Sequence, residues 1–322
     1  MNRGQFNDFI NTIGQYRSSN DYKAVDASNR LGRFALDELW LELIGMVRPD
    51  HDATDNDYSS GWTGKYGITS KEQFLASPDA QGKAFGDVLD KAIAILQPVL
   101  HYDGQTLNGQ EISTSGMLGA AFLTDVGDTL GFVKYGEDDP EPGQHSVKTT
   151  IARFNGYATP YGVDQDHNYT FLGSDGPDMI RGYEGKDYFV AKGGDDKFDG
   201  GGNVDTIRLP LTRAEYTVTG DGRSAEWHIK RQLDAGSMEH KKITNVELIE
   251  FAGGETIDLR KLQSAAPDPI TETVELQLEG WLEPRQVPIS QLTLEVNPAA
   301  SGAPVAKVGV QEGFLQDDTL SS

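Results

Sequence analysis

The stretch GYEGKDYFVAKGGDDKFDGG, residues 182–201, places glycine, aspartate and one large apolar residue at intervals of nine. Extended in both directions, the repeat aligns four aspartates in one column: Asp178, Asp187, Asp196 and Asp205. A second column, two positions later, is apolar throughout: Ile180, Phe189, Phe198 and Ile207. A period of nine is not the helical period of about 3.6 residues. We therefore expect short strands joined by identical turns.

Glycines stand at fixed distances from these aspartates. Two positions before successive aspartates stand Gly176, Gly185, Gly194 and then Asn203, and five positions before them stand Gly173, Gly182, Ala191 and Gly200. Glycine permits a positive φ angle and lets backbone carbonyls approach a bound ion. Calcium takes about six to eight oxygen ligands, whereas zinc prefers Cys and His, and the chain has no Cys. We therefore predict calcium as the cofactor, with these ligand residues: Asp178, Asp187, Asp196, Asp205, Gly176, Gly185 and Gly194.

The form G-x-x-G-x-D-x-U-x, where U is a large apolar residue, resembles the calcium-binding nonapeptide of RTX proteins. The resemblance covers residues 171–259, because the segments 201–219 and 243–259 look like the segment that follows and caps such repeats. It implies a parallel β-roll in which successive repeats lie on opposite edges. Stacked aspartates should then be 18 residues apart: Asp178 with Asp196, and Asp187 with Asp205. The alternative is a plain glycine-rich loop.

The composition limits the classes of partner. The 322-residue chain has 28 Lys and Arg against 50 Asp and Glu, a net charge of −22, and such a field repels nucleic acids and anionic membrane surfaces. We expect calcium ions, peptidoglycan or another glycan, and further copies of the chain as partners, and no nucleic acid. No apolar run reaches the roughly 20 residues that span a bilayer. The segment 1–14 also lacks the apolar core of a signal peptide, so we expect neither a membrane span nor classical secretion.

The resemblance to RTX proteins implies a different export route. That family is secreted unfolded by a type I system that reads an uncleaved C-terminal signal, and its members fold on meeting millimolar calcium outside. The resemblance thus implies an extracellular or cell-surface location. It also accounts for the missing disulfides, because ion binding would stabilise the fold in their place.

Residues 1–160 are expected to form a mainly helical domain. Apolar residues recur at helical spacing over 6–13 and again over 85–96, before Pro98. The segment STSGMLGAAFL then offers Ser113 or Ser115 as an N-cap. The small residues that follow would let this helix cross its neighbours closely.

Three runs in this region, SSNDYKAVDASNRLGRFALDELWLELIGMV, WTGKYGITSKEQFLASPDAQGKAF and YDGQTLNGQEISTSGMLGAAFL, resemble a phage-type lysozyme-like peptidoglycan hydrolase domain. The resemblance spans roughly residues 5–157. Its scaffold positions are Leu31, Gly32, Trp62, Gly64, Phe74, Pro78 and Gln81. It implies a carboxylic acid at the end of the first helix, which protonates the glycosidic oxygen.

The sequence departs from that family where the chemistry would be done. The general-acid position is Arg17, which cannot release its proton at physiological pH. Ala35 and Asp37 replace a glutamine and a glycine of the family, and Phe122 stands where a histidine is often found. We therefore expect a degenerate, non-enzymatic domain that serves as a glycan-binding, adhesive or assembly surface.

Two alternatives stay open for this domain. An active peptidoglycan hydrolase, as a secreted effector or phage tail component, would need Asp21, Glu38 or Glu42 to supply the acid. A retained groove would stack aromatic rings on sugar faces. Its candidate contacts are Trp62, Tyr58 and Tyr66, with Trp40 beside them. The opposing interpretation is that these rings belong to the core.

The C-terminal region follows the linker SAAPDP. Residues 273–281 and 290–298 alternate as strands do, and this region is either a segment exchanged between protomers or part of the export signal. The fold class predicted for the whole chain is α+β and multidomain. Its parts are a lysozyme-like helical domain at 1–160, a calcium-binding parallel β-roll with its cap at 168–262, and a small β-rich module at 270–322.

Overall fold

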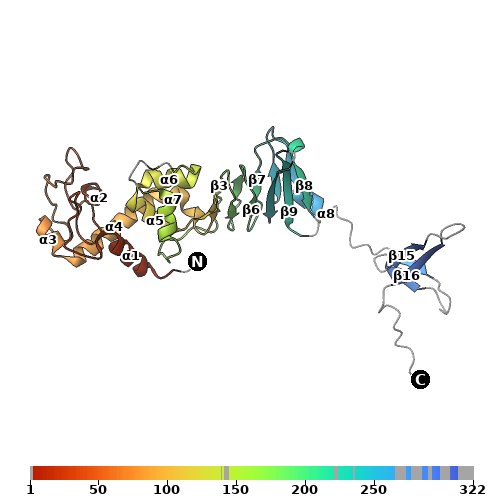
Figure 1. Cartoon of the computed structure of the whole chain (residues 1–322), viewed down its shortest axis with the longest axis horizontal. Helices are drawn as coiled ribbons and strands as arrows, with labels where there is room; N and C mark the ends of the chain where they lie inside the picture. The colour runs from red at the N-terminus through yellow and green to blue at the C-terminus, as the bar shows by residue number, and fades with distance from the viewer. Residues whose placement is uncertain are drawn as a thin grey trace, which may run out of the picture. The chain divides into compact units, whose positions relative to one another are not determined.

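The computed structural model describes most of the chain outside the linkers. The described residues are 3–138, 140, 145–220, 224–234, 236–264, 273–276, 285–288, 292–297 and 305–310. Contacts divide the chain into two compact units, Met1–Arg260 and Lys261–Ser322. The expected helical and repeat regions therefore lie in the same unit. Helices dominate its first part and strands its second, so the fold class is α+β (Figure 1).

The helical part contains seven α-helices and two short 3₁₀ turns within residues 3–138 and 145–160. These are α1 (Phe6–Ser18), α2 (Glu38–Leu43), η1 (Lys65–Gly67), α3 (Lys71–Leu75), α4 (Pro78–Leu96), η2 (Gln97–Tyr102), α5 (Thr114–Leu123), α6 (Val126–Tyr135) and α7 (Val147–Phe154). The periodic segments of the sequence correspond to α1 and α4. The chain continues past α4 as η2, because Pro98 is tolerated in the first turn of a new helix.

Helix α5 lies at the centre of this part, with every residue buried. Its N-cap is Ser113, whose hydroxyl accepts a hydrogen bond from Gly116 N. Ser115, the other candidate, instead accepts from Tyr157 N. A Cβ at Gly119 would lie 2.6 Å from Phe154 Cβ, so α7 can pack this closely only against a glycine. The small residues of α5 thus serve the close crossing that the sequence indicated.

The repeat region forms a coil whose strands alternate between two sheets. Its strands are β3 (Thr170–Leu172), β4 (Met179–Arg181), β5 (Tyr188–Val190), β6 (Asp196–Asp199) and β7 (Thr206–Arg208). Strands β3, β5 and β7 pair in parallel in one sheet, and β4 and β6 pair in parallel in the other. Paired residues are 18 positions apart, as in Phe171 with Phe189. This is the spacing that two nine-residue repeats predict.

The apolar column of the repeat fills the space between the two sheets. Phe171, Ile180, Phe189, Phe198 and Ile207 are all buried. The Phe171 and Phe189 rings stack with their centroids 5.2 Å apart within one sheet, and Phe189 meets Phe198 of the other sheet at 5.7 Å. Burial of a large apolar side chain contributes about 1.5–3 kcal/mol. One such residue per repeat therefore gives the coil a thin continuous core.

Each sheet is extended by strands that follow the repeats. These strands are β8 (Thr217–Gly220), β9 (Glu226–Gln232), β10 (Met238–Thr244), β11 (Leu248–Glu250) and β12 (Thr256–Asp258), with η3 (Arg213–Glu215) before them and α8 (Leu259–Ser264) after them. Strand β10 pairs in parallel with β6, and β11 pairs in parallel with β7. Their partners β9 and β12 are antiparallel. The last strands of the coil, β6 and β7, are thus paired, and the two sheets end instead at β8 and β12.

A hairpin from the helical part covers the other end of the coil. Strand β1 (Thr106–Leu107) pairs antiparallel with β2 (Gln110–Glu111) and, through Thr106, with Met179 of β4. The Tyr102 hydroxyl lies 3.2 Å from Leu172 O, and Gln105 Nε2 donates to Arg181 O at 2.8 Å. The helices and the coil therefore share a hydrogen-bonded sheet within the first unit.

The second unit contains two described hairpins. Strand β13 (Thr273–Leu276) pairs antiparallel with β14 (Arg285–Pro288), and β15 (Leu292–Asn297) pairs antiparallel with β16 (Val305–Val310). Both strand segments expected from the sequence, 273–281 and 290–298, include one of these strands, while their remaining residues lie outside the described ones. Among the helices of the described residues, none has the length and apolar character required to cross a membrane.

Candidate functional site

The four aspartates of the repeat lie inside the coil, at its two edges. Each side chain is almost fully removed from solvent, with Asp205 at 0% exposure. The parallel register stacks Asp178 on Asp196 and Asp187 on Asp205. Two columns of carboxylates result, one along each edge.

Backbone hydrogen bonds link successive members of a column. Asp178 N donates to Asp196 Oδ1 at 3.0 Å, and Asp187 N donates to Asp205 Oδ1 at 2.7 Å. The first aspartate of each column accepts in the same way, from Asn108 N at 2.8 Å for Asp178 and from Tyr169 N at 2.7 Å for Asp187. Each carboxylate therefore holds its own coil to the preceding one.

The two columns end on side chains of opposite charge. Strand pairing places Lys241 of β10 beside Asp196, and it places Glu247, just before β11, beside Asp205. We call Asp178, Asp196 and Lys241 the lysine-ended column, and Asp187, Asp205 and Glu247 the acid-ended column. Neither terminal residue belongs to the nine-residue repeat, so the sequence did not predict them.

The lysine-ended column is partly neutralised within the protein. Lys241 Nζ lies 2.6 Å from Asp196 Oδ2, 2.7 Å from Glu239 Oε1 and 3.1 Å from Gly194 O. Arg231 lies 2.5 Å from the other oxygen of Glu239. Two cations, Lys241 and Arg231, thus oppose three buried carboxylates, those of Asp178, Asp196 and Glu239. Burial raises the pKa of Asp196 to about 6, and the Lys241 ammonium acts in the opposite direction.

The acid-ended column has no such balance. Asp205 N donates to Glu247 Oε2 at 2.8 Å, while Asp205 Oδ2 is buried and has no hydrogen-bond partner in the described structure. Burial, followed by the charges of Glu247, Asp187 and Asp199, raises the pKa of Asp205 to about 7. Burial also raises the pKa of Glu247. A bound cation or proton would relieve this concentration of negative charge.

The glycines beside this column leave room that a Cβ atom would fill. A Cβ at Gly200 would collide with Asn245 O and Asp205 Oδ2, and a Cβ at Gly182 would collide with Gly200 O and Asp187 Oδ2. Carbonyl and carboxylate oxygens therefore lie so close to the backbone of these two glycines that no side chain would fit there. Such oxygens are the ligands of a hard cation, and Asp205 Oδ2 is free to bind one, but the three carboxylates of this column do not bring one oxygen each within 4.8 Å of one another.

The three glycines predicted as ligand residues differ in conformation. Only Gly194 has a positive φ, at 96°, and Asn203 takes the matching position of the fourth repeat with φ 66°. Gly176 and Gly185 are not among the positive-φ residues. Glycine is needed at these two positions because a Cβ atom would collide with the Asn108 side chain at Gly176 and with His167 O at Gly185. The expectation of a positive φ was therefore wrong for these two.

Arg17 lies at the end of α1, partly buried. Its Nε donates to Phe34 O at 3.2 Å and its Nη2 donates to Ala35 O at 3.0 Å. Burial lowers the pKa of Arg17 to about 10, with a smaller contribution from Arg30, which leaves the side chain charged at neutral pH. The guanidinium also lies over the Phe122 ring at 5.4 Å. A structural cation thus occupies the position where the resemblance to lysozyme-like hydrolases implies an acid.

The three carboxylates considered as replacement acids have different surroundings. Glu38 is 0% exposed, and its Oε2 accepts from Tyr58 N at 3.0 Å. Asp21 is exposed and accepts from Lys23 N, and partly buried Glu42 accepts from Asp50 N. A carboxyl that meets no solvent cannot reach a polymeric substrate, which leaves Asp21 and Glu42.

The three aromatic side chains proposed to contact glycan are not equally accessible. Tyr58 and Trp62 are 7% and 9% exposed, and the Trp62 ring lies 5.3 Å from that of Phe74 in the core. Tyr66 is 40% exposed, and its hydroxyl donates to Asp87 Oδ2 at 2.7 Å. A sugar contact in this region would therefore depend on Tyr66.

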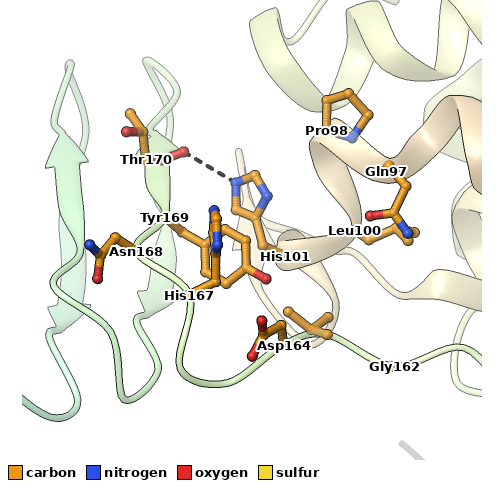
Figure 2. Close-up of a pocket in the computed structure, with 11 residues that line it drawn as sticks. Gln97, Pro98, Leu100, His101, Gly162, Asp164, His167, Asn168, Tyr169 and Thr170 are labelled. Carbon is orange, nitrogen blue, oxygen red and sulfur yellow. Dashed lines mark hydrogen bonds between the residues drawn. The ribbon is translucent and has the colours of Figure 1, made fainter.

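A pocket of about 590 Å³ lies where η2 meets the first coil (Figure 2). The His101 Nε2 lies 3.2 Å from Thr170 O, and its ring stacks on Tyr169 with 4.8 Å between centroids. Because a carbonyl oxygen only accepts, Nε2 carries the proton. Burial lowers the pKa of His101 to about 4. This histidine is a neutral structural group.

Comparisons with known proteins identify no family. No protein-family model matches the chain, and no curated protein matches it. A structure that shows some similarity is that of the extracellular lipase LipA from Serratia marcescens, at 18% identity and a TM-score of 0.16. The alignment covers 32% of this chain and 18% of the lipase chain, far below two thirds of it. Similarity at this level supports no argument about fold or function.

Proposed function

We propose that the chain is a calcium-binding protein of the extracellular space or cell surface, whose repeat coil is a β-roll of the RTX type. The observation that supports this proposal most directly is the acid-ended column. Asp205 Oδ2 is buried without a partner in the described residues, beside Glu247. Burying a carboxylate without compensation costs several kcal/mol. An external cation at this position would remove that cost.

Calcium would be held here by the free Oδ2 of Asp205 and by carbonyl groups near Gly182 and Gly200, with Glu247 or Asp187 as a further ligand, because these three carboxylates do not bring one oxygen each within 4.8 Å of one another. When bound, the ion supplies positive charge that neutralises the stacked carboxylates. The chain's own contribution is to position these oxygens by the parallel register and to exclude water through burial. The role is structural, because the ion joins a repeat strand to the cap.

The expected gain in stability is large for so small a coil. A ligand present at about 100 times its dissociation constant stabilises the folded state by about 2.7 kcal/mol if the unfolded chain does not bind it. Extracellular calcium modules have dissociation constants of about 10⁻⁴ to 10⁻³ M. The coil would then be fully stable only at extracellular calcium concentrations.

The first test is thermal unfolding of the full chain in EDTA and in millimolar calcium, for the wild type and for Asp205→Asn. Calcium should raise the wild-type melting temperature. The variant should melt higher than the wild type in EDTA, because an uncompensated carboxylate is gone, and should respond less to calcium. Asp175→Asn, an exposed aspartate outside both columns, is the matched control and should behave as the wild type. Identical wild-type curves in EDTA and calcium would reject the proposal.

We further propose that the helical part is non-enzymatic and serves as a glycan-binding or assembly surface. Arg17 at the general-acid position and the burial of Glu38 support this proposal. The second candidate, a peptidoglycan hydrolase, depends on exposed Asp21 or partly buried Glu42. Turbidity of purified cell-wall sacculi with millimolar calcium distinguishes the two. Clearing that disappears in Asp21→Asn would establish the hydrolase, whereas binding to sacculi without clearing would support a glycan-binding surface.

A further inference from the structure

A second group of carboxylates lies far from the repeat, around the start of α2. Glu38 begins this helix, and the loop that follows the helix contains Asp55 and Asp57. One carboxylate oxygen of each of these three residues lies within 4.8 Å of the others. Oxygens bound to the same calcium ion at about 2.4 Å can be no more than about 4.8 Å apart. The three side chains are therefore close enough to share one ion.

The buried member of this group lacks a partner. Glu38 is 0% exposed, and its Oε1 makes no hydrogen bond to any described residue. In the part of the chain that the structure describes, no Lys, Arg or His forms an ion pair with Glu38, Asp55 or Asp57. A buried carboxylate oxygen beside two further carboxylates thus has no compensating charge from the protein.

The backbone fixes the loop against Glu38. Glu38 N donates to Asn56 Oδ1 at 2.8 Å, and Tyr58 N donates to Glu38 Oε2 at 3.0 Å. These two bonds come from the residues directly after Asp55 and Asp57. The two aspartates are therefore held beside the free oxygen of Glu38 without using it.

The ligand set indicates the class of ion. All three groups are carboxylates, and the nearest additional group, formed by Glu42 and Asp50 with Glu38, also offers only carboxylates. Hard cations such as calcium take oxygen ligands, whereas zinc is usually bound by His or Cys. Asp55 and Asp57 are exposed, so water could complete the coordination.

We propose that Glu38, Asp55 and Asp57 bind a calcium ion in the helical part, separate from the repeat site. The ion would neutralise the buried Glu38 carboxylate and fasten the 48–61 loop to α2. Glu38 is in this proposal a structural ligand, which is a different role from a replacement acid in hydrolysis.

The test is the number of calcium ions bound per full-length chain, measured by equilibrium dialysis with metal analysis. Glu38→Gln should bind about one ion fewer than the wild type, and Asp55→Asn with Asp57→Asn should lose the same ion. The aspartate variants are at exposed positions, so they test the proposal even if Glu38→Gln folds poorly. Asp52→Asn, in the same loop but outside the group, is the control and should bind as many ions as the wild type.

The outcomes separate this proposal from that for the repeat. Asp205→Asn should reduce the ion count further when combined with Asp55→Asn and Asp57→Asn, because the two sites are independent. If the aspartate double variant and the Asp52→Asn control both bind the wild-type number of ions, the proposed site is wrong. If only the Asp205→Asn variant bound fewer ions, the conclusion that Glu38, Asp55 and Asp57 bind no ion would still stand.

Discussion

The Lys241 ammonium lies 2.6 Å from Asp196 Oδ2, and both side chains are excluded from solvent. It is placed there by parallel pairing of β10 with β6. The last position of the lysine-ended column is therefore filled by a cation of the protein, while the last position of the acid-ended column is a glutamate. The two edges of one coil should consequently respond differently to calcium.

Lys241→Met should strongly destabilise the protein in EDTA. Removing one member of a buried ion pair costs about 3–5 kcal/mol, because the other charge stays buried. Calcium should recover part of this loss, since Asp196, Glu239 and Gly194 O would then face a site without an ammonium. Urea unfolding in EDTA and in calcium measures both effects.

The matched control for this change is Lys230→Met on the neighbouring strand. Lys230 is exposed, and substitutions at such surface positions usually alter stability by less than about 0.5 kcal/mol. Equal stability of the two variants would contradict the role assigned to Lys241.

Arg17→Glu should destabilise the helical part without producing hydrolytic activity. The change removes both donors to Phe34 O and Ala35 O, and each lost hydrogen bond costs about 0.5–1.5 kcal/mol. Activity is not expected, because Phe122 remains apolar and Glu38 remains buried. Urea unfolding and sacculus turbidity measure the two results. A gain of clearing would mean that the groove keeps the rest of a hydrolytic site.

His101 should make the fold sensitive to acid. Its pKa is lowered from 6.5 to about 4 in the folded protein, so below pH 6.5 the unfolded chain binds a proton that the folded chain does not. Stability therefore falls as the pH drops from 6.5 towards 4. The contribution at pH 4.5 is on the order of 2–3 kcal/mol.

His101→Gln isolates this contribution from that of the carboxylates, which titrate in the same range. Urea unfolding of both proteins in EDTA at pH 7.5 and pH 4.5 gives two differences in stability. The wild type should lose more stability than the variant between these two conditions. Parallel losses would show that His101 does not titrate with a lowered pKa.

The repeat region was the part most completely predicted from the sequence. A strict period of nine fixes which residues point inwards, so the stacking of Asp178 on Asp196 and of Asp187 on Asp205 followed from counting alone. Counting along the repeat could not identify the residues at the ends of the two columns. Lys241 and Glu247 reach them only because β10 and β11 pair with β6 and β7, and such long-range register leaves no periodic signal.

Burial was the main property that the sequence did not reveal in the helical part. Trp62 and Tyr58 could equally have lined a groove or a core, and the packing of Trp62 against Phe74 decided for the core. In the sequence, Glu38 stood out only as one of three possible replacement acids. Its free oxygen beside Asp55 and Asp57 depends on how the 48–61 loop folds back.

The hairpin of β1 and β2 has a consequence for how the coil assembles. Asn108 N donates to Asp178 Oδ1, and Thr106 pairs with Met179. The first hydrogen-bond partners of β4 are therefore supplied by the helical part, which has its own large core. Starting an ordered array is usually harder than extending one. The helical scaffold would then give the coil a fixed starting edge at β4, from which further strands could be added towards the cap.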